Sequence, residues 1–237
     1  MAEGGVAVIV GAGPGLGASL ARRFAREGMS VAVAARRRDR LEPLAEELGG
    51  LGGSGVAFAC DATDEVDVRG LFAGVRQDLG EPDLVVFNAS GRVRKAIAEI
   101  ETAEFEQAWR NTCLGGFLVG REAAKIMAAR GRGTILFTGA TASVKGYANS
   151  AAFAVGKFGL RALAQSMARE LGPNGVHVAH IVIDGGIRSD RRSEDPDKGE
   201  DSLLDPDDIA ETYWQLYRQP RSAWTQEIDL RPWVEPF

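Results

Sequence analysis

The amino-acid sequence predicts an α/β fold: one doubly wound parallel sheet of about seven strands, with helices on both faces. Short β-branched and apolar runs alternate with longer helical stretches along the chain, which is the pattern of strand–helix–strand units. The run Leu84–Phe87 is apolar at every position, as expected for a parallel strand covered on both faces. The chain has 237 residues and shows no internal repeat or linker. We therefore expect a single domain over 1–237.

In the first part of the chain, strands and helices alternate at short intervals. Strands are predicted at Val6–Val10, Val31–Ala35, Val56–Ala59 and Leu84–Phe87. Helices are predicted between them at Gly15–Arg26, Leu41–Leu48 and Glu65–Leu79. Glycines follow each helix closely, as is common at helix C-termini.

The second part contains longer helices. A helical region from about Ala103 to Arg130 precedes further elements: a strand at Thr134–Phe137, a helix at Ala151–Leu171, a strand at Val176–Ile183 and a last strand at Glu227–Leu230. Asp205 and Pro206 predict the N-cap and first residue of a helix that runs to about Arg218. The segment 188–204 is polar and rich in charge. A loop of this length in a compact domain predicts a lid or substrate loop.

Composition excludes several functional classes. The net charge is −5, and the one basic cluster is Arg36, Arg37, Arg38 and Arg40, so we expect no nucleic-acid partner. The N-terminal apolar run is too short to span a membrane or to act as a signal peptide. We expect a cytoplasmic protein with no membrane partner.

Cysteine and histidine give no sign of a metal site. Cys60 and Cys113 are too few for a disulfide framework and lack metal-ligand spacing. His177 and His180 lie on one predicted strand at an odd separation, so their side chains point to opposite faces. We expect reduced thiols, structural histidines and no metal.

A glycine-rich turn joins the first strand to the first helix, with the sequence Gly11-Ala12-Gly13-Pro14-Gly15-Leu16-Gly17. Gly11 permits a tight turn, Gly15 lets the backbone approach a pyrophosphate, and Gly17 lets helix and strand pack closely. The free N–H groups at the helix start favour phosphate. We expect this turn, including Gly13, Pro14 and Leu16, to bind a dinucleotide.

The second strand ends at Ala34-Ala35-Arg36, with Arg37 next. A site for NAD usually has an acidic side chain here to bind the ribose hydroxyls. Guanidinium groups suit a 2′-phosphate instead, by charge and by paired hydrogen bonds. NADP(H) is therefore expected in preference to NAD(H); the other interpretation is a solvated basic helix start.

Further motifs resemble the short-chain dehydrogenase/reductase family, which has a Rossmann-type fold. The spacing of Gly11, Gly15 and Gly17 is similar to the family's form of the turn. The resemblance extends to Asp61-Ala62 after the third strand, Asn88-Ala89-Ser90-Gly91 after the fourth, Asn111, and Lys157. It implies that Asp61 contacts adenine, that Asn111 belongs to a catalytic tetrad and that Lys157 holds the nicotinamide ribose. Thr138, Gly185 and Ile187 are also expected near the cofactor.

Two expected hydroxyls are missing. Phe153 stands where the family has its catalytic Tyr, and Ala140 stands where it has Ser. The family's Pro-Gly after the sixth strand is replaced by Asp184-Gly185; Asp184 either caps a turn or contacts substrate. Loss of a positioned acid typically costs about 10²–10⁴-fold in rate, and losses within one catalytic unit are not additive.

Several groups could replace the proton donor. The candidates are Tyr147, Thr141, Ser143, Thr138, and Lys157 acting directly or through water held by Asn111.

We derive three functional hypotheses. The first is an NADP(H)-dependent oxidoreductase on a small alcohol or carbonyl, with an altered donor. The second is a catalytically silent NADP(H)-binding sensor or partner subunit, and the third is a non-redox lyase or isomerase on the same scaffold. The resemblance also implies a homodimer or homotetramer formed through the helices near 103–130 and 151–171.

Overall fold

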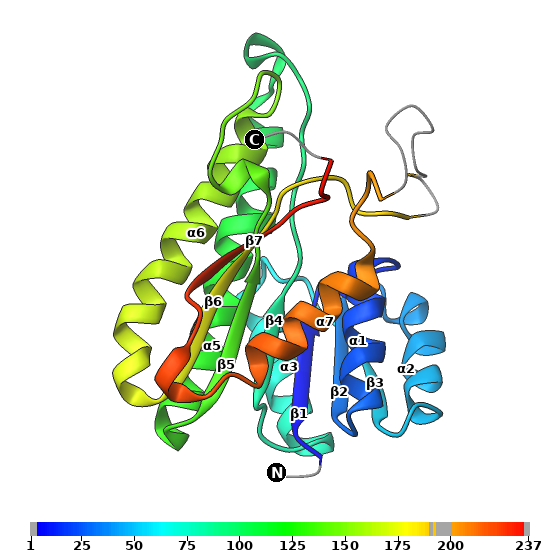
Figure 1. Cartoon of the computed structure of the whole chain (residues 1–237). Helices are drawn as coiled ribbons and strands as arrows, with labels where there is room; N and C mark the ends of the chain where they lie inside the picture. Colours follow the sequence, from blue (N-terminus) through cyan, green and yellow to red (C-terminus); the bar gives the residue numbers. More distant parts are fainter. Residues whose placement is uncertain (1–3, 190–191, 193–200, 235–237) are drawn as a thin grey trace.

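Seven parallel strands form the central sheet of the protein in a computed structural model, which describes residues 4–189, 192 and 201–234. The strands are β1 (Val6–Val10), β2 (Ser30–Ala35), β3 (Ser54–Ala59), β4 (Leu84–Phe87), β5 (Gly133–Thr138), β6 (Val176–Ile183) and β7 (Glu227–Leu230). Their order is β3-β2-β1-β4-β5-β6-β7, and every neighbouring pair is parallel (Figure 1). The predicted fold class is confirmed. Most of the predicted lid, at 190–191 and 193–200, lies outside the described residues.

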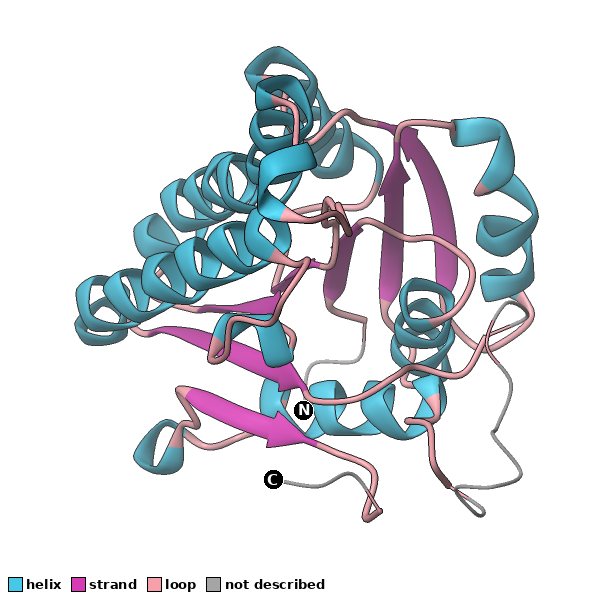
Figure 2. Ribbon diagram, turned by 90° about the horizontal axis from the view of Figure 1, so that it is seen from above, coloured by secondary structure: helices cyan, strands magenta, loops and turns pink. Residues whose placement is uncertain are grey.

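Helices cover both faces of the sheet (Figure 2). One face packs against α1 (Leu16–Arg26), α2 (Glu42–Gly49) and α7 (Pro206–Tyr217). In Figure 1, α7 crosses in front of the strands beside α1. The other face packs against α3 (Glu65–Asp78), α5 (Gly115–Arg130) and α6 (Ala151–Leu171).

The alternation of side chains along β1 explains its continuous apolar sequence. All five of its residues are buried. Ala7 and Ile9 join the core under α1 and α7, whereas Val6, Val8 and Val10 join the core under α3, α5 and α6. Successive strand residues point to opposite faces, so every residue of a strand covered on both faces is buried.

The predicted helix 103–130 is divided into three parts. Helix α4 (Thr102–Trp109) leads into a π-helical turn, Arg110–Leu114, and then into α5. Such turns insert one residue into an α-helix and often occur at functional sites. The inserted residue changes the direction in which the following side chains point.

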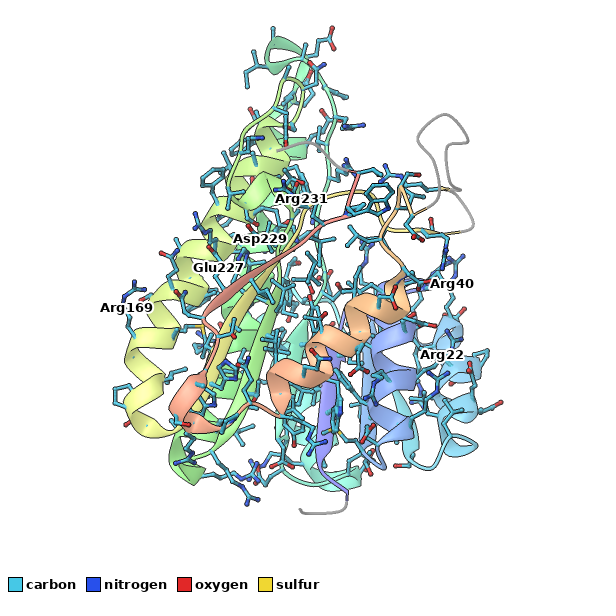
Figure 3. The ribbon with its side chains drawn as sticks, in the orientation of Figure 1. Arg22, Arg40, Arg169, Glu227, Asp229 and Arg231 are labelled. Carbon is cyan, nitrogen blue, oxygen red and sulfur yellow. The ribbon has the colours of Figure 1, made fainter. Side chains whose placement is uncertain are left out.

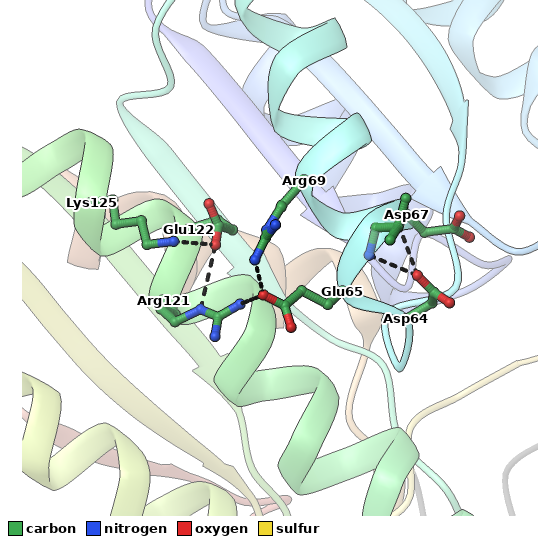
Figure 4. Close-up of polar contacts among 8 residues, drawn as sticks. Asp64, Glu65, Asp67, Arg69, Arg121, Glu122 and Lys125 are labelled. Carbon is green, nitrogen blue, oxygen red and sulfur yellow. Dashed lines mark hydrogen bonds and ion pairs between the residues drawn. The ribbon is translucent and has the colours of Figure 1, made fainter.

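Charged side chains join α3 to α5 on the surface (Figure 4). Glu65 pairs with Arg69 on its own helix and with Arg121 of α5, the latter at 2.7 Å. Asp64 caps α3 by accepting from the backbone N–H groups of Val66 and Asp67. Hydrogen bonds from Arg121 and Arg69 lower the pKa of Glu65, so this contact is an ion pair at neutral pH.

The two histidines of β6 have separate structural partners. His177 stacks on Trp224 with ring centres 5.0 Å apart, and its Nε2 lies 2.8 Å from the carbonyl oxygen of Thr225. His180 is fully buried, with Nδ1 3.0 Å from a carboxylate oxygen of Glu227. Within the described part of the chain, no three His, Cys, Asp or Glu residues are grouped to hold a metal ion.

Among the described helices, none combines the length and apolar character that a membrane crossing requires. The expected cytoplasmic location stays a prediction.

Candidate active site

The glycine turn presents an open surface at the start of α1. A Cβ atom on Gly11 would lie 2.5 Å from the backbone nitrogen of Ala89, and one on Gly17 would lie 2.8 Å from Cα of Ala12. Both positions therefore require glycine for close packing. In contrast, a Cβ on Gly13 or Gly15 would meet nothing within 4 Å. Gly15 is the N-cap of α1 with φ 94°, a conformation that side chains disfavour.

A cavity of about 1140 Å³ lies in front of this turn, between α1 and the start of α2. Pro14 lines it, whereas the side chain of Leu16 is buried in the core and leaves only its backbone at the helix start. Ala35, Arg36 and Arg37 line the opposite wall, at the end of β2. The predicted glycines and arginines thus face one space.

The arginines of this cavity differ in their pairing. Arg22 forms two hydrogen bonds with Glu47, at 2.7 and 2.9 Å. Arg36, Arg37 and Arg40 have no carboxylate partner among the residues that the structure describes. Arg40 lies on the α1–α2 side of the molecule near Arg22 (Figure 3). The sequence analysis did not assign Arg40 to the site; a 3-10 turn at Arg38–Arg40 returns it to the cavity.

The end of β4 meets the glycine turn, whereas the residues after β3 form a local turn of their own. Asn88 donates from Nδ2 to the carbonyl oxygen of Gly11 at 3.1 Å, which joins β4 to the turn. Asp61 accepts from the backbone and hydroxyl groups of Thr63 at 2.9 and 2.8 Å through the same carboxylate oxygen, Oδ1. This local turn fixes Asp61 and the buried Ala62 directly after β3. Ligands of such folds bind where the strand order reverses, which here is between β1 and β4.

The π-helical turn holds the loop after β4 against α6. The hydroxyl of Thr112 accepts from the backbone N–H of Gly91 at 2.9 Å. A Cβ on Gly156 would lie 3.0 Å from that of Thr112, so α6 contacts the same side chain. Asn111 accepts a hydrogen bond from Gln107 at 2.8 Å. Thr112 was not predicted as a site residue, because a buried threonine has no distinctive sequence pattern.

Lys157 lies at the base of a second cavity, of about 1060 Å³, that also contains Asn88, Ser90 and Phe153. Its side chain is 3% exposed. Nζ donates to the carbonyl oxygen of Thr138 at 2.7 Å, and it lies 5.9 Å from the ring centre of Phe153. Burial lowers the pKa of Lys157 to about 7, because desolvation disfavours the charged form.

The candidate hydroxyl groups differ in whether they already form hydrogen bonds within the protein. Thr138 Oγ1 lies 2.8 Å from the hydroxyl of Tyr213, within the core. Ser143 is fully buried and accepts from the backbone N–H of Ala140 at 3.1 Å. Thr141 and Tyr147 line the cavity. Tyr147 is 51% exposed, with the Lys145 ammonium 5.9 Å from its ring.

The segment after β6 forms the opposite wall of this second cavity. Gly185 and Ile187 line it, and Ile187 pairs with Leu204. Gly185 has φ 153°, and a Cβ there would lie 2.8 Å from the Pro232 ring. Asp184 is buried in an ion pair with Arg231, so its carboxylate has a structural partner.

Comparisons with known proteins show the family and the fold to which the chain is similar. The sequence pattern described as short chain dehydrogenase matches residues 5–198. The chain is 39% identical to a short-chain dehydrogenase from Rhodopseudomonas palustris, with a TM-score of 0.85 over 98% of this chain and 100% of that one. It is 27% identical to an alcohol dehydrogenase from Thermococcus sibiricus complexed with 5-hydroxy-NADP, with a TM-score of 0.89 over 99% of both chains.

A longer relative matches as well. Glycine betaine reductase from Emericella nidulans is 32% identical over 99% of this chain, which spans 19% of that protein's length. The chain belongs to the short chain dehydrogenase family.

Proposed function

We propose that this protein is an NADP(H)-dependent oxidoreductase that interconverts an alcohol and a carbonyl, with Lys157 as its proton donor. The observation that carries the proposal is the position of Lys157 Nζ, buried at the base of a cavity that Phe153 and Ala140 also line. These are the two residues that the resemblance predicts at the family's Tyr and Ser positions. Thr138 and Ser143 have their hydroxyls in other hydrogen bonds. Lys157 is therefore the buried group that still has N–H groups available to donate a proton to the substrate.

The first cavity fits the phosphorylated cofactor. Gly13 and Gly15 leave open space at the start of α1, which suits a pyrophosphate. Arg36, Arg37 and Arg40 supply positive charge that no described carboxylate pairs, which suits a 2′-phosphate. The Thermococcus sibiricus relative, described with 5-hydroxy-NADP, supports the same cofactor class.

A bound NADPH would supply the hydride to the carbonyl carbon. Lys157 then donates a proton to the carbonyl oxygen as that oxygen gains the electron pair of the C=O bond, and the neutral amine regains a proton from water. An ammonium has three donors, and the Thr138 carbonyl takes one of them. A donor whose pKa is near the working pH is the most effective general acid, and burial places Lys157 there.

The test compares Lys157→Met with Lys125→Met, an exposed surface lysine of α5, in NADPH oxidation with a carbonyl panel. We expect the first variant to lose roughly 10²–10⁴-fold in kcat and the second to match wild type. Because the ammonium is the donor, kcat for reduction falls as pH rises through about 7. The reverse oxidation needs the neutral amine and rises over the same range.

Two further variants make this test decisive. One outcome would contradict the assignment of Lys157: Tyr147→Phe loses kcat and the pH dependence, while Lys157→Met stays active. NADPH binding without turnover, in both wild type and Phe153→Tyr, would instead favour a catalytically silent cofactor-binding protein.

We also propose that the protein forms a homodimer or homotetramer through α5 and α6. The support is a set of large apolar side chains on these helices that remain exposed: Phe117 at 40%, Val155 at 46% and Phe158 at 43%. Exposed apolar groups that gather on one surface are typical of contacts between subunits.

A further inference from the structure

The cavity around Lys157 is strongly cationic in a protein of net charge −5. Its lining includes Arg92, Arg94, Lys157 and Arg192, and the described residues that line it include no Asp or Glu. A cavity lined by one sign of charge raises the local concentration of oppositely charged ligands. Its charge is therefore suited to an anion.

Phe153 holds one of these cations in place. The guanidinium carbon of Arg92 lies 5.3 Å from the centre of the Phe153 ring, within the range of a cation–π contact. Lys157 Nζ contacts the same ring at 5.9 Å. A guanidinium stacked on a ring keeps its N–H groups at the edge, where they can bind a carboxylate or phosphate in pairs.

Among the described residues, no carboxylate balances the positive charge of the two loop arginines. Lys95 pairs with Glu104 at 2.5 Å, whereas Arg92 and Arg94 on either side of Val93 form no ion pair within the described ranges. Partial burial lowers the pKa of Arg92, and the charges of Arg94 and Arg192 lower it further. Like charges held together without a counter-charge repel, and a bound anion would remove that repulsion.

We propose that the substrate carries an anionic group, a carboxylate or a phosphate, apart from its reacting carbon, and that Arg92 and Arg94 bind this group beside Lys157. Phe153 is then the platform that orients Arg92. This inference names the substrate class for the proposed function, and it rests on that function only in assuming that the substrate's reacting group is a carbonyl. The anion site itself does not depend on whether hydride transfer occurs.

Calorimetric titration of the full chain tests the anion site without requiring catalysis. The probes are benzoate and phenyl phosphate, with benzyl alcohol as the neutral match, at low ionic strength and with and without saturating NADP+. We expect the anions to bind and benzyl alcohol not to bind. Arg92→Ala and Arg94→Ala each weaken anion binding roughly ten- to hundred-fold, the range for a hydrogen bond to a charged group. The stronger of the two anions identifies which group the site prefers.

Three control variants make the titration specific. Arg169→Ala removes an exposed arginine of α6 far from this cavity (Figure 3) and leaves anion binding unchanged. Arg36→Ala weakens NADP+ and not benzoate, because it lines the other cavity. Arg92→Lys keeps the charge and loses the paired N–H groups, so its affinity falls between those of wild type and Arg92→Ala.

The outcomes separate the two proposals. Unchanged anion affinity in Arg92→Ala and Arg94→Ala overturns the anion site. A loss of NADP+ affinity in these variants that equals their loss of benzoate affinity overturns it as well. Retained Arg92-dependent anion binding, with no turnover of 4-carboxybenzaldehyde by NADPH, overturns the proposed oxidoreductase alone. If both proposals hold, kcat/KM for 4-carboxybenzaldehyde exceeds that for benzaldehyde at least ten-fold, and Arg92→Ala removes the difference.

Discussion

Single side chains determine which groups of the second cavity can bind a ligand or donate a proton. At position 153 a ring without a hydroxyl contacts two cations, Arg92 and Lys157. A phenol there would compete for the same protons that Lys157 is proposed to donate. Phe153 therefore has no proton to donate and provides an apolar surface for a guanidinium.

Arg36 provides a prediction at this scale. We expect Arg36→Ala to weaken NADPH binding roughly ten- to hundred-fold and to leave NADH nearly unchanged, because only NADPH carries the 2′-phosphate. Fluorescence titration of both cofactors measures this. Arg22→Ala is the matched control, since its guanidinium lines the same cavity but is neutralised by Glu47. Equal losses for both cofactors would mean that Arg36 does not contact the phosphate.

The sequence predicts the residues of local motifs better than those brought together by loops. Gly11–Gly17 and Arg36 lie directly after strands whose apolar runs are plain in the sequence, and the structure places Gly13, Pro14, Gly15 and Arg36 around one cavity. Arg40 and Arg92 depend on the path of a 3-10 turn and of a loop. No periodic pattern encodes those paths, so neither arginine was predicted.

At the scale of elements, the π-helical turn between α4 and α5 brings two parts of the site together. It places Thr112 where its hydroxyl meets Gly91 and its side chain meets Gly156 of α6. The sequence predicts one continuous helix here, because a π-helical turn and an α-helix favour similar residues.

The outer surface of α5 and α6 leads to a prediction about the oligomeric state of the protein. We expect wild type to sediment as a dimer or tetramer and Phe158→Glu to shift to a smaller species, because a carboxylate buried without a partner is costly. Sedimentation velocity over a range of concentrations measures the shift. Ile97→Glu, which alters an apolar side chain that is 74% exposed outside these helices, should sediment like wild type. A wild-type monomer at all concentrations would exclude the proposed interface.

At the scale of the whole molecule, the two cores on either side of the sheet account for the success of the fold prediction. Apolar runs specify the buried central strands, and right-handed helical connections between parallel strands leave few other arrangements. The sequence could not specify the buried polar contacts that close the sheet at β6 and β7. His180, Glu227 and Arg161 meet there through hydrogen bonds of 2.6–3.0 Å.

This cluster makes global stability sensitive to acid. Burial lowers the pKa of His180 to about 4; the carboxylate of Glu227 opposes this shift, and the charges of Lys157 and Arg161 add to it. Between pH 6.5 and 4 the unfolded chain binds a proton that the folded chain does not, so the free energy of unfolding falls as pH falls.

We expect His180 to contribute about 2 kcal/mol to the loss of stability between pH 7.5 and pH 5. Urea unfolding of wild type and His180→Gln at both pH values measures it. The variant starts from lower stability, since it alters a buried site, but loses less on acidification. Parallel pH slopes in the two proteins would rule out this role for His180.

Thr138 bonds to helices on opposite sides of the sheet: its hydroxyl to Tyr213 of α7, and its carbonyl to Lys157 of α6. Sequence drift in α7 is therefore not neutral for the chemistry, although that helix faces away from the substrate. A directed-evolution library confined to residues that line the cavity would miss positions in α7 that alter Lys157 through Thr138.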